Sequence, residues 1–119
     1  MKKDIFAETR TDKSKYLEGE EVVISITITN NSAHTVELNF MSSQHYDFII
    51  SKDGKDVWRW SQDKMFAMVI ESLALKSHET QVYEEKWSSK DASSGRYEVL
   101  AMITSQPPYE ARCAFYVET

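Results

Sequence analysis

The side chains best suited to covalent chemistry are a single cysteine, Cys113, and three histidines, His34, His45 and His78. A nucleophilic site needs a serine or cysteine beside a histidine that a carboxylate orients. The histidines fall in or beside predicted turns, and no Gly-x-Ser-x-Gly motif accompanies the serines. Cys113 follows the alternation of a predicted strand, as a small buried hydrophobic residue would. The sequence therefore predicts a protein that is not an enzyme.

Metal binding has little support. His45 and Asp47 are spaced to share one face of a strand, but no third ligand follows at a suitable spacing, and zinc sites use at least three protein ligands. Thioethers can bind Cu(I). Four methionines lie in segments with core-like patterns: Met41, Met65, Met68 and Met102. We expect them to fill gaps in the core, and we predict no metal and no cofactor.

Two indoles on one predicted strand form a further candidate site. Trp58 and Trp60 are spaced to point to the same face, where they could stack on sugar rings as in a carbohydrate-binding module. They could equally pack in a β-sandwich core. Across a predicted hairpin, Tyr46, Phe48 and Ile50 are spaced to point to the same face as the two indoles, and this favours core packing.

Composition excludes several other classes of function. The chain has 119 residues, of which 41% are hydrophobic, with a formal net charge of −5. That size predicts a single domain over residues 1–119. The negative charge argues against nucleic acid and against anionic lipid as partners. No apolar run approaches the roughly 20 residues that a spanning helix needs.

The opening stretch, Met1–Glu8, lacks the apolar core of a secretory signal. One cysteine excludes an internal disulfide and fits a reducing compartment. A cytoplasmic location is expected on these grounds, and a secreted or surface location only if a signal has been removed.

Alternation of period two dominates the chain. From Glu21 the apolar positions Val22, Ile24, Ile26 and Ile28 alternate with polar or smaller residues, as in a half-buried strand. Asp53-Gly54 between two such runs predicts a hairpin. The predicted strands cover residues 22–29, 36–40, 46–50, 57–60, 73–75, 80–86, 97–104 and 111–117.

About eight short strands separated by turns predict an all-β fold, an antiparallel immunoglobulin-like β-sandwich. At most one helical turn is expected, near residues 63–66. The strand at 111–117 could form an edge that pairs with another copy, so we expect a monomer or an edge-strand dimer.

The segment from Glu37 to Ile103 resembles the Bacillus intracellular proteinase inhibitor family, the BsuPI-type domains. The resemblance rests on a series of short runs in a compatible order: Leu38-Asn39-Phe40, Ser43-Gln44-His45-Tyr46-Asp47-Phe48, Val57-Trp58-Arg59-Trp60-Ser61, Lys64-Met65-Phe66-Ala67, Leu73-Ala74-Leu75 and Gly95-Arg96-Tyr97-Glu98-Val99. It implies an immunoglobulin-like sandwich, which agrees with the alternation. It also implies inhibition of serine proteases, with a subtilisin-like intracellular enzyme as the partner.

A protein inhibitor presents an extended, rigid loop to the active-site cleft. Two loops meet that description in the sequence. One presents Met41 and continues through Ser42 and Ser43. The other contains Gln106, Pro107 and Pro108 and ends at Tyr109. Two alternatives remain open: a non-inhibitory interaction or adhesion module with the same fold, and a carbohydrate-binding module that uses the two indoles.

Overall fold

A computed structural model describes residues 4–119. The stretch 1–3, on which the expectation of a missing signal peptide partly rests, lies outside the described residues. Within residues 4–119 there are ten strands and one 3-10 helix: β1 (Ile5–Thr11), β2 (Lys15–Leu17), β3 (Glu21–Asn30), β4 (Val36–Phe40), β5 (Tyr46–Lys52), β6 (Lys55–Arg59), η1 (Trp60–Asp63), β7 (Glu71–Leu75), β8 (Thr80–Ser88), β9 (Gly95–Ile103) and β10 (Tyr109–Glu118). No helix in this range is long and apolar enough to span a membrane. The predicted all-β class is confirmed.

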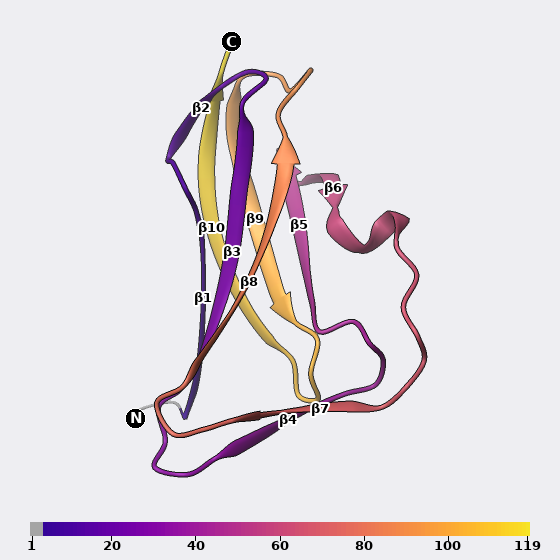
Figure 1. Ribbon diagram of the computed structural model, residues 1–119. Helices are drawn as coiled ribbons and strands as arrows, with labels where there is room; N and C mark the ends of the chain where they lie inside the picture. The colour runs from indigo at the N-terminus through magenta and orange to yellow at the C-terminus, as the bar shows by residue number, and fades with distance from the viewer. Residues whose placement is uncertain (1–3) are drawn as a thin grey trace.

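The strands form two facing sheets and a separate hairpin-like pair. One sheet has the order β1-β3-β8, and the other has the order β2-β10-β9-β5-β6. Figure 1 shows these sheets running along the long axis of the molecule, with β4 and β7 paired across one end. This end, rather than the opposite end near the C-terminus, is where the predicted loops lie.

The alternating run of β3 explains the core between the sheets. Val22, Ile24, Ile26 and Ile28 have no exposed surface, because this face of the strand is covered by the opposite sheet. The other fully buried large side chains come mainly from strands of the facing sheet: Tyr16, Phe48, Phe115, Ile50, Ile103 and Val99. The predicted strand register is therefore confirmed where one face is apolar.

The predicted hairpin at Asp53-Gly54 is also confirmed. Asp53 has φ 53° and Gly54 has φ 79°, and two successive residues in the left-handed region match the twist of the flanking strands. Lys52 and Lys55 are the last pair of β5 and β6.

Two predictions need correction. The stretch 111–117 is an edge strand only in part: β10 pairs with β9 along its length, and its residues 116–118 also pair with β2 in parallel. The helical turn lies at Trp60–Asp63, earlier than predicted. β1 and β2, which were not predicted, account for the two strands beyond the expected eight.

The buried face of β3 generates a stability prediction. Replacing Ile26, which is fully buried, by alanine should lower the free energy of unfolding by about 3 kcal/mol, because the lost contacts leave a cavity. Urea unfolding followed by circular dichroism measures the change. The control is Val82→Ala on β8, which is 51% exposed and should change stability by no more than about 0.5 kcal/mol. Equal effects of the two substitutions would contradict the register.

Candidate functional site

The two predicted loops lie side by side. The loop Met41–Ser43 follows β4, and the loop 105–108 joins β9 to β10. The Gln106 amide donates to the Asn39 carbonyl at 2.9 Å, and Phe40 forms an isolated bridge with Ser105. The structure therefore brings together residues that are far apart in the sequence.

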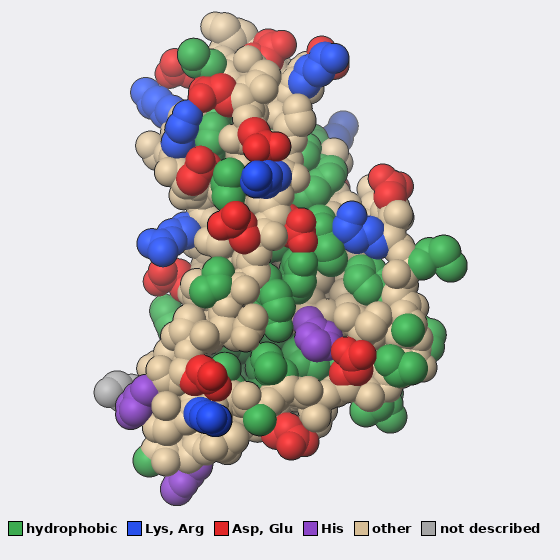
Figure 2. All heavy atoms as spheres, in the orientation of Figure 1, with side chains coloured by type: hydrophobic (Ala, Val, Ile, Leu, Met, Phe, Trp, Pro, Cys, Tyr) green, Lys and Arg blue, Asp and Glu red, His purple; other side chains and the backbone are tan. Residues whose placement is uncertain are grey.

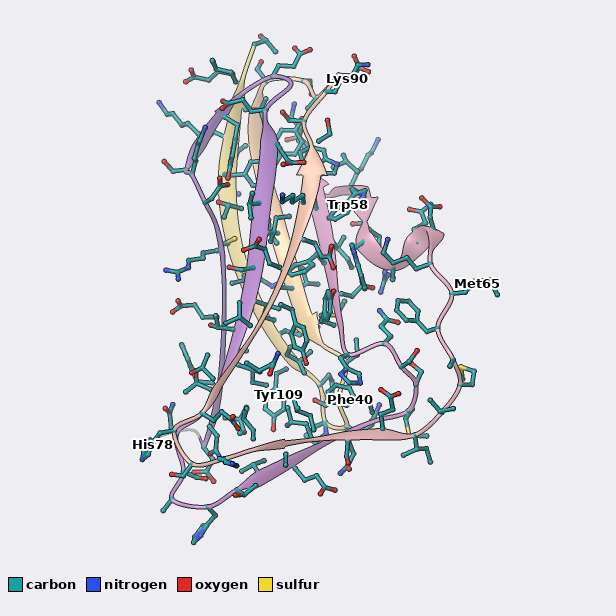
Figure 3. All side chains as sticks on the ribbon, viewed as in Figure 1. Phe40, Trp58, Met65, His78, Lys90 and Tyr109 are labelled. Carbon is teal, nitrogen blue, oxygen red and sulfur yellow. The ribbon has the colours of Figure 1, made fainter. Side chains whose placement is uncertain are left out.

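The β9–β10 loop is held down at both ends. Ser105 is buried, and its hydroxyl donates to the Pro107 carbonyl at 2.8 Å. Gln106, Pro107 and Pro108 are exposed, but Tyr109 is partly buried and packs against the core. This loop presents polar and proline surface, and its aromatic side chain faces the body of the protein (Figure 3).

The loop after β4 exposes Met41 and supports another segment. Met41 is 60% exposed. Ser43 is joined to Ala67 by two hydrogen bonds: the Ser43 amide donates to the Ala67 carbonyl at 2.9 Å, and the Ala67 amide donates to Ser43 Oγ at 2.9 Å. The Ser42 hydroxyl accepts a bond from the Gln44 amide at 3.1 Å.

The partner of Ser43 belongs to residues 64–70, which we call the projecting segment. It connects η1 to β7 and runs along the outside of the sandwich (Figure 1). Met65 is 98% exposed and Met68 is 85% exposed. The prediction that these two methionines and Met41 fill gaps in the core is wrong, since all three are exposed, whereas Met102 is partly buried.

Sequence reasoning missed the projecting segment for a physical reason. Its apolar residues are dense enough to suggest a buried element, but they follow neither a strand period nor a sustained helical one. The available signal was a high density of apolar residues without strand or helix periodicity. Such a pattern indicates apolar residues that lie outside regular secondary structure and are not buried in the core.

Trp60 holds the beginning of the projecting segment. The Lys64 ammonium lies 4.9 Å from the centre of the Trp60 ring, and the Phe66 ring lies 5.8 Å from it at an interplanar angle of 48°. The Lys64 amide donates to the Ser61 carbonyl at 3.1 Å. Both neighbours of Met65 are therefore tied to one indole.

Trp60 in turn belongs to an aromatic column between the two sheets. Its ring stacks on Tyr46 at 4.5 Å, and Tyr46 stacks on Tyr83 of β8 at 4.5 Å. The Tyr46 hydroxyl donates to the carboxylate of Glu85. Burial, reinforced by this hydrogen bond, raises the pKa of Tyr46, which keeps its hydroxyl protonated.

The positions of Trp58 and Trp60 distinguish core packing from a shared sugar-binding face. Trp60 lies in η1 rather than on β6, so Trp58 and Trp60 do not form one strand face. Both are partly buried and pack against the core. The predicted preference for core packing is confirmed.

A buried carboxylate fixes the turn that leads to Trp60. The side chain of Asp47 is 1% exposed. It accepts hydrogen bonds from Arg59 Nε at 2.9 Å, from Ser61 Oγ at 2.6 Å and from the amides of Ser61 and Phe48 at 3.1 and 2.9 Å. These bonds draw the chain inward directly after β6, which explains why η1 begins at Trp60.

His45, Asp47 and Cys113, which the sequence offered for metal binding or catalysis, are not arranged as a catalytic or metal site. His45 Nε2 lies 2.7 Å from Glu71 Oε1, and its ring stacks on Phe40 at 4.0 Å. Asp47 is engaged by the donors above. In the part of the chain that the structure describes, no three His, Cys, Asp or Glu residues are grouped to hold a metal ion. Burial raises the pKa of the Cys113 thiol, which disfavours the reactive thiolate.

Comparison with protein families gives one match that covers most of the chain. The family model described as BsuPI, intracellular proteinase inhibitor, matches residues 9–108. That range includes the loop after β4, the projecting segment and all but the last residue of the predicted 106–109 loop. No curated protein matches the chain.

Solved structures share the fold at low sequence identity. The sporulation control protein Spo0M from Bacillus subtilis has a TM-score of 0.60 and 14% identity, over 98% of this chain and 50% of its own. The CARDB domain of a protein from Pyrococcus furiosus has a TM-score of 0.56 and 12% identity, over 96% and 92%. A β-glucosidase from Erythrobacter marinus has a TM-score of 0.53 and 13% identity, over 96% and 15%. This chain thus spans half of the Spo0M chain and a small part of the β-glucosidase, and the likeness concerns the sandwich alone.

The Asp47 cluster generates a second prediction. Asp47→Ala leaves the Arg59 guanidinium and the Ser61 hydroxyl without their acceptor, so we expect the free energy of unfolding to fall by about 3 kcal/mol. Amide hydrogen exchange should accelerate most at residues 60–67. Urea unfolding and exchange followed by mass spectrometry measure the two effects.

The matched control removes an acidic side chain from the surface. Glu21 lies 3.8 Å from Lys86, and both are more than half exposed, so Glu21→Ala should leave the unfolding midpoint unchanged. Unchanged exchange at residues 60–67 in Asp47→Ala would show that the carboxylate does not hold this region.

Proposed function

The chain belongs to the BsuPI family of intracellular proteinase inhibitors, and on that premise we propose that it inhibits a subtilisin-like intracellular serine proteinase by binding to it. Membership of the family is the observation that carries this proposal. The family implies a proteinase as the partner, and its name fits the expected cytoplasmic location. We propose further that the whole of residues 1–119 acts as one inhibitory domain.

The surface at the β4–β7 end supports inhibition by binding. Tight inhibitors bury about 1,600 Å² in total, and they lose little conformational entropy when their loops are already ordered. The β9–β10 loop is bonded to β4 through the Gln106 amide and the Asn39 carbonyl, and the loop after β4 is bonded to residues 64–70 through the Ser43 amide and the Ala67 carbonyl. Met41, in the loop after β4, provides exposed apolar surface.

The choice of a subtilisin-like enzyme rests on the family resemblance and on chemistry. Such enzymes accept large apolar side chains beside the bond they cleave. The exposed large hydrophobic side chains of the loop after β4 and of residues 64–70 are methionine, valine and isoleucine, whereas an enzyme with an acidic primary pocket requires a basic side chain.

The proposal is tested by titrating a purified intracellular subtilisin-type proteinase with the protein and following hydrolysis of a short peptide substrate. We expect stoichiometric loss of activity at nanomolar concentrations. An unrelated β-sandwich protein at the same concentration controls for substrate competition and should have no effect.

Full activity at a large molar excess would contradict inhibition of this enzyme class. The non-inhibitory interaction module would then be the better description of the same fold. Sedimentation of the free protein, measured in parallel, establishes whether the inhibitor acts as a monomer or as a dimer.

A further inference from the structure

We propose that the projecting segment, residues 64–70, is the part of this chain that enters the active-site cleft of the proteinase, with Met65 in its primary apolar pocket. This inference rests on the proposed function and names the site for it. Both predicted loops remain part of the proposed contact surface. The inserted residue, however, belongs to the projecting segment and to neither loop.

The first observation is the concentration of exposed apolar surface. Met65 and Met68 are 98% and 85% exposed, and Val69 and Ile70 are 47% and 78% exposed. Met41, from the loop bonded to this segment, is also exposed. The other exposed large hydrophobic side chains are scattered over separate strands: Phe6, Leu17, Val57, Val82 and Tyr116.

Contiguous apolar exposure of this kind marks an interaction site, whereas single exposed residues need no explanation. Figure 2 shows hydrophobic side chains gathered over the side of the molecule where the projecting segment runs. The segment contributes four large exposed hydrophobic side chains within six residues.

The second observation is a backbone that is free to pair. Residues 64–70 belong to no strand or helix, and Lys64 has extended φ and ψ of −118° and 151°. Within residues 4–119, the amide and carbonyl groups of Met65 and Phe66 have no hydrogen-bond partner. An extended peptide with unpaired groups can add to the edge of a binding cleft as a strand does.

The third observation is that the free residue lies between anchored ones. Lys64 and Phe66 both contact the Trp60 ring, and both backbone groups of Ala67 bond to Ser43. Figure 3 shows Met65 at the outer limit of the segment, directed away from the sandwich. The side chain is thus presented in advance, which lowers the entropic cost of inserting it.

The chemistry of methionine then indicates the kind of pocket. Its unbranched thioether side chain adapts to apolar cavities of irregular shape. A pocket that selects a basic or an acidic side chain would leave its own charge unpaired against Met65. The partner is therefore a proteinase with a large, uncharged primary pocket.

The test compares Met65→Asp with Met41→Asp. Both methionines are exposed, so both variants should keep the thermal unfolding midpoint of the wild type. We expect the inhibition constant to rise at least about 100-fold in Met65→Asp, because the carboxylate would be buried in an apolar pocket. Met41→Asp should raise it less than about 10-fold.

A second experiment asks whether the cleft itself is occupied. A proteinase whose cleft is filled by a covalently attached peptide inhibitor should form no complex with this protein on size-exclusion chromatography, whereas the free enzyme should form one. Complex formation with the filled enzyme would overturn the insertion.

The remaining outcomes separate the two proposals. If the wild type inhibits but Met65→Asp stays within two-fold of it, the assignment of the segment is wrong and inhibition stands. If the wild type is a dimer that Met65→Asp dissociates, the segment binds a second copy and the assignment also fails. If the wild type inhibits no subtilisin-type enzyme, the proposed function fails and this inference fails with it.

Discussion

The burial of one carboxylate, that of Asp47, determines how the chain leaves the sandwich. A buried carboxylate is tolerated only when its oxygens are fully hydrogen-bonded, and Asp47 obtains its donors from its own strand, from Arg59 and from Ser61. Meeting that requirement forces the chain to turn inward after β6. The turn places Trp60 beside Tyr46 and directs the following residues outward along the molecule. The position of the projecting segment is thus a consequence of satisfying a charge in the core.

Much of the sandwich could be predicted because its strands obey a period. The residues of β3 alternate without interruption, and Asp53-Gly54 supplies the backbone conformations that its hairpin requires. β1 and β2 could not be recognised in the same way, because β2 has only three residues and the seven residues of β1 have their apolar side chains at the start without alternation. The edge position expected for residues 111–117 holds only in part, because β2, which was not predicted, covers β10 at residues 116–118.

The site was less predictable than the fold, and the reason is physical. Loops carry no periodic signal, so the exposure of Met65 and Met68 could not be read from their spacing, and their apolar character pointed to the core instead. The short sequence runs that carry the family resemblance contain the residues that support the site. Asp47, Arg59, Trp60, Ser61 and Phe66 fall within them, and in the structure these residues are the supports of the projecting segment. They act on the segment by positioning its backbone, while the exposed side chains beside them do not contribute to the fold.

The residues that hold the projecting segment are different from the residues that it exposes, and this difference has an evolutionary consequence. Positions 65 and 68 make no demand on packing, so natural variants can change there without loss of the folded state, whereas Trp60 and Phe66 are constrained by each other. Surface residues of this kind can diverge quickly between related chains while the scaffold beneath them drifts slowly. Lys64 and Phe66, on either side of Met65, both contact the Trp60 ring. The backbone at position 65 can therefore keep its conformation while the side chain there changes as the partner protein changes.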